Sequence, residues 1–358
     1  MNKPYVNMVK SQVNFLILVT IFHLTLQMSK QGGGANNFYK IDNQFKDTIS
    51  DLVFGNGQRY LAATSWDGII TVWEFPEDYS QATEKYRYAD PQKNAFLRCC
   101  FNEDCSDLFF GDSQGQIFVV KLNEPNLQGK PPHKLVDSSN TPIVGLCYCV
   151  PKSQVVLLKL NKQLQILDTQ MITIELTNKP ICMSISGTIL YVAMLGPSIV
   201  KIDLNTRTLQ QVQTSHMYQI RSISVSPTKP DYYISGSIYG QVEICAGSNR
   251  TILPCHRTDQ TPQIWASNSV AMHPNQPFAI SAGGDGTIKM INLEKGRPGR
   301  EQKMSNNSFP LTTVAISSNG EVAAIAQGYD WSRGAEKYLS DKPELQLYIR
   351  KMANNEFG

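Results

Sequence analysis

The sequence predicts an all-β fold in which seven similar four-stranded sheets form a ring, like the blades of a propeller. Three observations support this prediction. From about Asp47 onward, the 358-residue chain has almost no helical periodicity and consists of short β-rich runs bounded by Gly, Asn, Asp and Pro. Seven strong apolar strands mostly recur at intervals of about 45 residues, the period of a four-stranded blade. Asp-Gly pairs stand between strand-like runs, where a tight hairpin needs positive φ.

The seven strong strands give the order of the units along the chain. They are residues 68–73, 115–120, 163–167, 198–202, 240–244, 286–291 and 345–349. Weaker runs before them fit the inner strands of the same blade, as in 49–54 and 60–63 of the first unit and 222–225 and 232–235 of the fifth. One blade cannot bury both faces of its sheet, so neighbouring blades must cover each other, and closing the ring removes exposed edges.

Two short segments, 66–68 and 284–286, place Asp-Gly between strands, and we expect tight hairpins there. The second is no phosphate-binding loop, because Gly-Lys-Ser/Thr does not follow it. The Trp-Asp dipeptide that ends many propeller blades is degenerate and reads Trp73-Glu74, Leu167-Asp168, Ile202-Asp203 and Ile291-Asn292. The fold prediction therefore depends on the period and the strand pattern.

The composition is that of a globular protein with nearly balanced charge. It has 33 Lys and Arg against 30 Asp and Glu, for a net charge of +3. This balance excludes a polyanion-binding surface that covers the whole molecule and leaves only local basic patches. The eight cysteines show no Cys-x-x-Cys pair and mostly lie in apolar runs, so we expect small buried side chains in a reducing compartment.

The N-terminal residues 1–37 are predicted to be an extension that precedes a propeller of residues 38–358. Within the extension, residues 13–26 are strongly apolar and follow Lys3 and Lys10, the layout of a signal peptide. The stretch is shorter than the roughly 20 apolar residues of a spanning helix, polar residues interrupt it, and no typical cleavage site follows. We expect Met28 to be the working start and no membrane insertion. Alternatively, residues 13–26 are a signal peptide or membrane anchor, or a helix that packs on the protein.

Three segments carry a resemblance to a known family: Tyr329–Tyr338 (YDWSRGAEKY), Leu253–Arg257 (LPCHR) and Ser65–Glu74 (SWDGIITVWE). Together they resemble the Rae-one/Gle-two mRNA export factor family of WD-repeat propellers and, less closely, the Bub-three checkpoint propeller. The Tyr-Asp-Trp-Ser segment is characteristic of the export factor, whereas Cys-His-Arg is shared by both. The resemblance covers about Asp47 to Lys351.

The resemblance implies a seven-bladed WD-repeat β-propeller that acts as an adaptor without enzymatic activity, cofactor or metal. Such an adaptor binds the GLEBS segment of an FG-repeat nucleoporin across one propeller face, with mRNA or ribonucleoprotein as a further partner and no small-molecule substrate. It would work at the nuclear pore, in the nucleus, nuclear envelope and cytoplasm. Trp66 matches a tryptophan of the family's peptide-binding face, and Arg257 matches the arginine of Cys-His-Arg. An indole and a guanidinium suit an acidic, partly apolar peptide.

The chain departs from the family at two positions of that face. Gln241 stands where the family has an arginine, after the glycine of the fifth blade's last strand, and Lys159-Leu160-Asn161 replaces the third blade's Ser-Trp-Asp. Losing a cation and an aromatic anchor predicts weaker binding or a partner that has diverged as well.

A polar segment of the last blade completes the predicted binding face. Tyr329, Asp330, Trp331 and Arg333 lie between two strands and are too polar to be a strand themselves. We expect a loop at the rim of the blade, where binding residues commonly lie. The alternative is a loop in which Trp331 packs against its own blade.

Two further candidate sites have simple structural interpretations. Lys295, Arg297, Arg300 and Lys303 form the densest basic stretch, which is either a solvated loop or a phosphate contact for RNA, without aromatic residues for base stacking. Cys255-His256-Arg257 could be a reactive thiol beside a base, or a zinc site with Cys245 and His273, but neither spacing fits a known signature and the Cys-His pair lacks an orienting third group. We therefore expect a structural or partner-facing turn.

Three other functions compete with export. A checkpoint adaptor shares the fold and the peptide-binding mode. A propeller hydrolase or lactonase needs several inward-facing His, Asp or Glu, and the chain has only five histidines. A secreted propeller requires residues 13–26 to be a true signal peptide.

Overall fold

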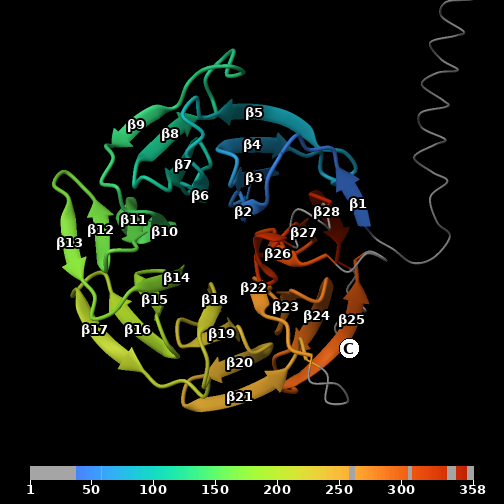
Figure 1. Ribbon diagram of the computed structural model, residues 1–358. Coiled ribbons are helices and arrows are strands. Elements are labelled where there is room, and N and C mark those ends of the chain that lie inside the picture. The colour runs from blue at the N-terminus through green and yellow to red at the C-terminus, as the bar shows by residue number, and fades with distance from the viewer. Residues whose placement is uncertain (1–37, 58, 258–262, 305–308, 337–343, 353–358) are drawn as a thin grey trace, which may run out of the picture. The chain divides into compact units, whose positions relative to one another are not determined.

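Seven four-stranded antiparallel sheets follow one another around a ring in the computed structural model, as Figure 1 shows. The structure describes residues 38–352 except residue 58 and residues 258–262, 305–308 and 337–343. The predicted all-β, seven-bladed propeller is confirmed. The predicted extension 1–37, with its apolar residues 13–26, lies outside the described residues, as do Lys337 and Tyr338 of the Tyr-Asp-Trp-Ser segment.

The strands of the seven blades have the following bounds. Blades 1 and 2 contain β2 (Ile49–Phe54), β3 (Tyr60–Ser65), β4 (Ile69–Glu74), β5 (Thr83–Ala89), β6 (Phe96–Phe101), β7 (Asp107–Asp112), β8 (Ile117–Lys121) and β9 (His133–Val136). Blades 3 and 4 contain β10 (Ile143–Cys149), β11 (Gln154–Lys159), β12 (Gln163–Leu167), β13 (Ile172–Glu175), β14 (Pro180–Ser186), β15 (Ile189–Met194), β16 (Ser198–Asp203) and β17 (Thr208–Val212). Blades 5 and 6 contain β18 (Ile220–Val225), β19 (Tyr232–Ser237), β20 (Gln241–Ala246), β21 (Asn249–Pro254), β22 (Ser267–Met272), β23 (Phe278–Gly283), β24 (Thr287–Asn292) and β25 (Arg297–Lys303). Blade 7 contains β26 (Leu311–Ile316), β27 (Val322–Gln327), β28 (Gln346–Lys351) and β1 (Phe38–Ile41), and a 3-10 helix, η1 (Val150–Lys152), joins β10 to β11.

The ring closes by sharing one blade between the two ends of the chain. In blade 7 the strand order is β1-β28-β27-β26, so the first strand in sequence is the outer strand of the last blade. This also corrects one expectation: the seven strong strands are the third strands of their blades, not the last. Gln241 accordingly begins β20, with β21 outside it.

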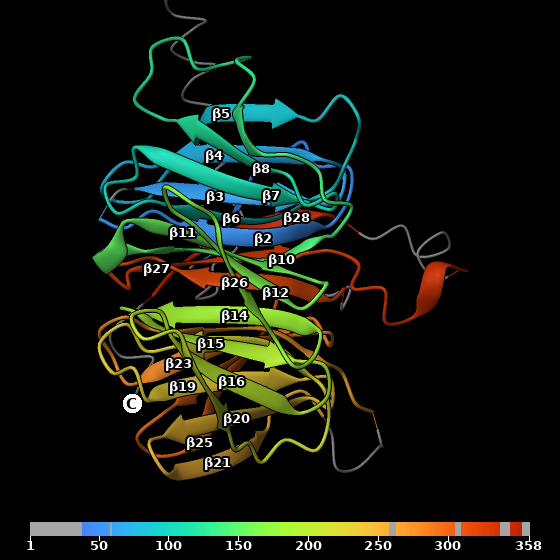
Figure 2. The ribbon, with the colours of Figure 1, turned by 90° about the vertical axis from the view of Figure 1, so that its left-hand side faces the viewer.

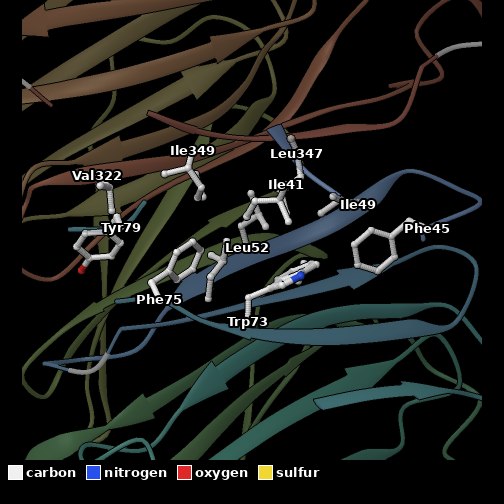
Figure 3. Packing of buried hydrophobic residues seen from close by; sticks show 14 of the residues in the cluster. Ile41, Phe45, Ile49, Leu52, Trp73, Phe75, Tyr79, Val322, Leu347 and Ile349 are labelled. Atoms are coloured by element: carbon white, nitrogen blue, oxygen red, sulfur yellow. The ribbon is translucent and has the colours of Figure 1, made fainter. Parts of the chain in front are cut away.

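Hydrophobic clusters lie between neighbouring blades. The cluster at the seam joins Ile41 of β1 and Ile349 of β28 to Leu52 of β2 and Trp73 of β4, and Figure 3 shows these side chains facing one another. Trp73 also packs edge-on against Phe45, with ring centroids 6.1 Å apart. Because each blade buries one face against the blade before it and the other against the blade after it, no blade is stable alone.

A second set of contacts ties the inner strands together around the axis. Asp51, Ser222 and Ser269 each follow the β-bulge of an inner strand. Their side-chain oxygens accept hydrogen bonds from backbone N–H groups of the next blade, at Cys99 (3.1 Å), Val270 (3.0 Å) and Val314 (3.1 Å). The bulge turns these side chains toward the neighbouring blade.

The predicted hairpins at the two Asp-Gly pairs are confirmed. Gly68 and Gly286 have φ of 75° and 74°, in the left-handed region that favours glycine. A Cβ at Gly68 would lie 2.7 Å from the carbonyl oxygen of Asn94 in the next blade, so the position also needs a residue without a side chain.

Loops gather at the two ends of the ring, as the edge-on view in Figure 2 shows. Since the strands of each blade alternate in direction, the turns between second and third strands lie at the same end as the connections from one blade to the next. We call this end the Trp66 face, after the residue that follows β3. Within the part of the chain that the structure describes, no helix is long and apolar enough to cross a membrane.

Candidate protein-binding face

A cavity of about 690 Å³ lies within the ring and is lined by residues from all seven inner strands. Trp66, Tyr329, Asp330 and Trp331, from the Trp66 face, also line it. The structure therefore brings together four of the predicted binding residues from opposite ends of the sequence, because the last blade lies beside the first.

The two tryptophans at this cavity are half exposed. Trp66 has 49% and Trp331 has 47% of its surface accessible, although both are the type of residue that normally buries most of its area. Trp331 has φ of 60°, which is rare for a bulky residue and must be imposed by its surroundings. The prediction that this segment is a loop is confirmed. Trp331 packs partly on Tyr329 of its own blade and leaves about half of its surface open, so both its packing and a partner contact remain predictions.

Local hydrogen bonds hold the loop of Trp331 in place. Asp330 accepts from the backbone N–H (3.1 Å) and the hydroxyl (2.6 Å) of Ser332, which closes a tight turn around Trp331. Tyr329 donates its hydroxyl to the carbonyl of Gly334 (2.6 Å), and its ring meets Trp331 edge-on at 5.4 Å. The indole is thus positioned before any partner arrives, which lowers the entropy that binding must overcome. Arg333 lies exposed in the same turn.

Arg221 is a charged residue of the cavity that sequence reasoning missed. It lies on β18, and burial lowers the pKa of its guanidinium, with the carboxylate of Asp330 acting in the opposite direction. Among the described residues it makes no hydrogen bond, in contrast to Arg98 of β6, which donates to the carbonyls of Val144 (2.9 Å) and Leu97 (2.7 Å). Its donors therefore face the cavity and suit an anionic group. A cation inside the inner-strand run 220–225 was the available sequence signal.

Asp330, the carboxylate that acts on Arg221, is held by hydrogen bonds. Asn268 of β22 donates one hydrogen bond to the Asp330 carboxylate (3.1 Å) and another to the carbonyl of Leu311 (2.8 Å). The cavity mouth therefore presents one carboxylate that is already hydrogen-bonded and one guanidinium that is not.

Arg257 and Gln241 lie on the same face but do not line the cavity. The guanidinium carbon of Arg257 lies 4.6 Å from the centre of the Tyr239 ring, within cation–π distance. Gln241 follows Gly240 at the start of β20, two residues after Tyr239. Lys159, where the family has a tryptophan motif, is buried and donates to the hydroxyl of Ser139 (3.1 Å).

The basic stretch forms an exposed strand, which corrects the expected solvated loop, while the phosphate contact stays a prediction. Arg297–Lys303 forms β25, the outer strand of blade 6. Arg297 pairs with Asn292 at one end and Lys303 pairs with Thr287 at the other, so at about 3.4 Å per residue they lie roughly 20 Å apart. Arg300 lies between them, and Lys295 precedes the strand. The unpaired edge of β24 draws this stretch into the sheet despite its Gly and Pro residues, and a register shift between Lys289 and Ile291 accommodates Pro298.

The expectation that Cys-His-Arg lacks an orienting group is wrong. The Nδ1 atom of His256 lies 3.0 and 3.1 Å from the carboxylate oxygens of Asp285, and its Nε2 atom lies 2.8 Å from the hydroxyl of Ser281. Burial would raise the pKa of Asp285, but the hydrogen bond and charge of His256, together with hydrogen bonds from Thr287, lower it. Because Ser281 and His256 are fully buried, no substrate reaches them, and the arrangement fixes the loop to blade 6.

The thiol and metal hypotheses for this segment find no support in the geometry. Burial raises the pKa of the Cys255 thiol to about 12, so the reactive thiolate is scarce at neutral pH. Across the described ranges, no group of three or more His, Cys, Asp and Glu is arranged to hold a metal ion.

Comparisons with known proteins agree with this architecture. The family model "WD domain, G-beta repeat" matches residues 39–74 and 247–292. Protein Rae1 of Drosophila melanogaster is 25% identical over 335 residues, covering 88% of this chain and 94% of that protein. The mRNA export factor rae-1 of Caenorhabditis elegans is 24% identical, covering 88% of each chain. The mitotic checkpoint protein BUB3.1 of Arabidopsis thaliana is 24% identical, covering 87% of this chain and 92% of that protein. The resemblance inferred from three short segments is confirmed.

Solved structures support the fold. U3-55K matches with a TM-score of 0.74 at 12% identity, covering 89% of this chain and 99% of that one. The WD40 repeats of RRP9 match with the same TM-score and identity. At this level of identity the likeness concerns the propeller alone.

Proposed function

We propose that this chain, a WD-repeat β-propeller similar to mRNA export factors over most of its length, is a non-enzymatic adaptor in nucleocytoplasmic mRNA export. It binds a GLEBS-type segment of an FG-repeat nucleoporin across the Trp66 face, at the nuclear pore, and moves between nucleus and cytoplasm. The names of the relatives support the export role, and the geometry of the face supports the binding role.

One observation carries the proposal: two half-exposed indoles and a guanidinium without a side-chain hydrogen bond among the described residues line the same cavity. Trp66 and Trp331 offer large apolar anchors, and Arg221 offers charge-assisted hydrogen bonds to an acidic side chain. Aromatic and arginine residues at the centre of a surface are the typical energetic anchors of protein interfaces. A segment with apolar residues flanked by Asp or Glu matches this arrangement.

The same face argues against the enzymatic alternative. The described residues contain a Ser-His-Asp arrangement in blade 6, but Ser281 and His256 are closed to solvent. The cavity itself pairs Arg221 with a hydrogen-bonded Asp330 and lacks a histidine among its lining residues. A histidine base beside a nucleophile is therefore missing from the described cavity lining, and its other carboxylate, Asp51, already accepts from the N–H groups of Cys99 and Leu52.

RNA contact through blade 6 receives less support. Three of the four cations of the predicted phosphate contact are spread along the outer strand β25 and Lys295 precedes it. Glu301 of the same strand lies 2.8 Å from the Lys289 ammonium on the neighbouring strand. In this proposal, the chain contacts mRNA or ribonucleoprotein indirectly, through its protein partner.

The test is direct binding of labelled GLEBS segments to the full chain. We expect a nucleoporin GLEBS peptide to bind in fluorescence anisotropy, and Trp66→Ser and Trp331→Ser to weaken it at least tenfold. Leu209→Ser, which removes an exposed apolar residue from the outer strand β17, is the matched control and should bind as the wild type. Preference for a GLEBS peptide from a kinetochore protein would favour the checkpoint alternative, and no binding to either by the folded chain would remove the adaptor proposal.

A further inference from the structure

Blades 5 and 6 differ at one equivalent position of the Trp66 face. In blade 6, Ser281 is the fourth residue of β23, and Asp285 follows it by four residues and pairs with His256. In blade 5, Ser235 is the fourth residue of β19, and Tyr239 follows it by four residues. His216 contacts Ser235 as His256 contacts Ser281, with Nε2 3.1 Å from the hydroxyl oxygen. Tyr239 therefore stands where blade 6 has a carboxylate.

Because of this replacement, one ring nitrogen of His216 in blade 5 lacks a hydrogen-bond partner among the described residues. The Nδ1 atom of His216 is buried and has no hydrogen-bond partner among the described residues. The nearby carboxylate of Glu243 is already used, since it accepts from the hydroxyl of Thr214 and the backbone N–H of Ser215, both at 2.6 Å. An unsatisfied buried polar atom destabilises the fold, so Tyr239 is present at a cost to the structure.

Tyr239 forms the centre of a stack on the Trp66 face. Its ring lies 4.1 Å from the ring of Tyr218, with 18° between the planes, and the guanidinium of Arg257 lies against it at 4.6 Å. Tyr218 remains 42% exposed. The Nε atom of Arg257 is buried and has no hydrogen-bond partner among the described residues. Its guanidinium also forms no ion pair with any of these residues.

Exposed apolar side chains surround this stack. Met217 is 80% exposed, and Leu195 and Ile238 are about as exposed as Tyr218. We call the six residues Leu195, Met217, Tyr218, Ile238, Tyr239 and Arg257 the Tyr239 surface. Of the eleven large apolar residues that are exposed in the described chain, seven lie on the Trp66 face: Trp66, Leu195, Met217, Tyr218, Ile238, Ile264 and Trp331.

Hydrogen bonds lock the loops of the Tyr239 surface together. Gln219 accepts from the N–H of Gly196 (2.7 Å) and donates to the carbonyl of Met194 (3.0 Å), which joins the Leu195 turn to the Met217 loop. The N–H of Ile238 donates to the carbonyl of Gln219 (3.0 Å). The apolar residues are thus held exposed on a fixed backbone, which favours binding over fluctuation.

We propose that the Tyr239 surface is a peptide subsite for a large apolar side chain, aromatic or long aliphatic, with Asp or Glu close to it in sequence. The apolar side chain packs on Tyr218, Met217 and Ile238, and the carboxylate reaches the donors of Arg257. This inference deepens the proposed function, because the segment belongs to the protein partner bound across the same face.

Protein rather than RNA fits the charge of the surface. The loops that form it, residues 195–197, 213–219, 238–240 and 255–257, carry Arg257 as their one cation in the sequence. A single strand of RNA could stack a base on Tyr218, but its phosphates need several cations along the path. The aliphatic neighbours of the stack match peptide side chains.

The experiment compares Tyr239→Asp and Tyr239→Phe in the full chain. Tyr239→Asp supplies His216 with a carboxylate like the one that Asp285 gives His256, so the melting temperature should stay the same or rise. The aromatic stack with Tyr218 and Arg257 is lost in the same variant. Peptides selected from a displayed random library on the wild-type chain are synthesised with fluorescein and titrated by anisotropy. We expect selected peptides that contain the apolar–acidic pair to lose at least tenfold in affinity with Tyr239→Asp and less than about threefold with Tyr239→Phe.

Two results would overturn the subsite. Unchanged affinity of every selected peptide in Tyr239→Asp overturns it, as does the finding that fluorescein-labelled oligouridine, and no peptide, depends on Tyr239. Met217→Ser, at a position that is 80% exposed, gives the same test if Tyr239→Asp folds poorly. A nucleoporin GLEBS probe is titrated in parallel. If it fails to bind while selected peptides still require Tyr239, the export proposal fails and the subsite stands. If the GLEBS probe binds through Trp66 but Tyr239→Asp changes the affinity of neither the GLEBS probe nor the selected peptides, the subsite alone fails.

Discussion

Thr48 and Tyr329, which are 281 residues apart, exchange two hydrogen bonds across the seam of the ring. The Thr48 hydroxyl donates to the Tyr329 carbonyl (3.1 Å) and accepts from the Tyr329 N–H (3.2 Å). The backbone carbonyl of Thr48 also accepts from the N–H of Trp66 (3.1 Å). One residue thereby fixes the loops of both exposed tryptophans, so closure of the ring and assembly of the binding face are the same event.

Replacing Thr48 with valine should weaken both stability and binding. The change keeps the shape but removes the two buried hydrogen bonds between the Thr48 hydroxyl and the Tyr329 backbone, at about 1–3 kcal/mol. Urea unfolding should show this loss, and anisotropy should show weaker binding of a GLEBS peptide. Thr83→Val, on the exposed outer strand β5, is the control. Full retention of both properties would show that the seam does not position the tryptophans.

Replacing Arg221 with glutamine should separate binding from stability. The guanidinium is largely buried without a hydrogen bond among the described residues, so removing its charge should leave the melting temperature unchanged or raise it. The affinity for an acidic GLEBS peptide should fall by about 1.5–3 kcal/mol, the usual value of a charged hydrogen bond. The exposed Arg207→Gln serves as the matched variant, and equal affinity in both variants would remove Arg221 from the site.

Replacing Gln241 with arginine should increase affinity. The position begins β20 beside Tyr239 and Arg257, where the resembling family carries a cation for an acidic residue of the peptide. A gain of about tenfold, equal to roughly 1.4 kcal/mol, is expected in titrations at low salt. The gain should shrink as salt rises, since exposed charges are screened. Gln210→Arg on β17 adds the same charge elsewhere, and an equal gain there would point to non-specific attraction.

Acidification below about pH 6.5 should destabilise the fold, because two buried histidines have lowered pKa values. Burial lowers the pKa of His216 and of His273, and His273 Nδ1 also accepts from the N–H groups of Asn275 (3.1 Å) and Gln276 (2.9 Å). The unfolded chain therefore binds protons more readily than the folded chain as pH falls through the unfolded pKa. The stability that the two neutral histidines contribute is fully present above the unfolded pKa and is lost as the pH falls below it.

Unfolding free energies at pH 7.5 and 5.5 test this sign. Wild type should lose stability at pH 5.5, and Tyr239→Asp should lose less, because a carboxylate beside His216 favours its charged form. A constant value, or a gain on acidification, would contradict the assignment.

The sequence by itself determined the repeating unit and its closure into a ring. The spacing of the strong strands, together with glycines such as Gly68 at positions of positive φ, follows from backbone geometry that acts over a few residues. Local segments also led to the prediction that Trp66, Trp331 and Arg257 bind a partner, which stays a prediction. The sequence missed that Arg297–Lys303 forms an outer strand, because the demand for a fourth strand comes from the edge of β24 and not from the residues themselves.

Only the tertiary structure decided which side chains act together. Arg221 and Asp330 line the same cavity, and His256 is hydrogen-bonded to Asp285, although neither pair is close in sequence. In blade 5, Tyr239 occupies the position that corresponds to Asp285 and stacks on Tyr218. Local periodicity fixes each blade, but a binding face is made where different blades meet. Its chemistry depends on distances and burial that arise only when the ring has closed.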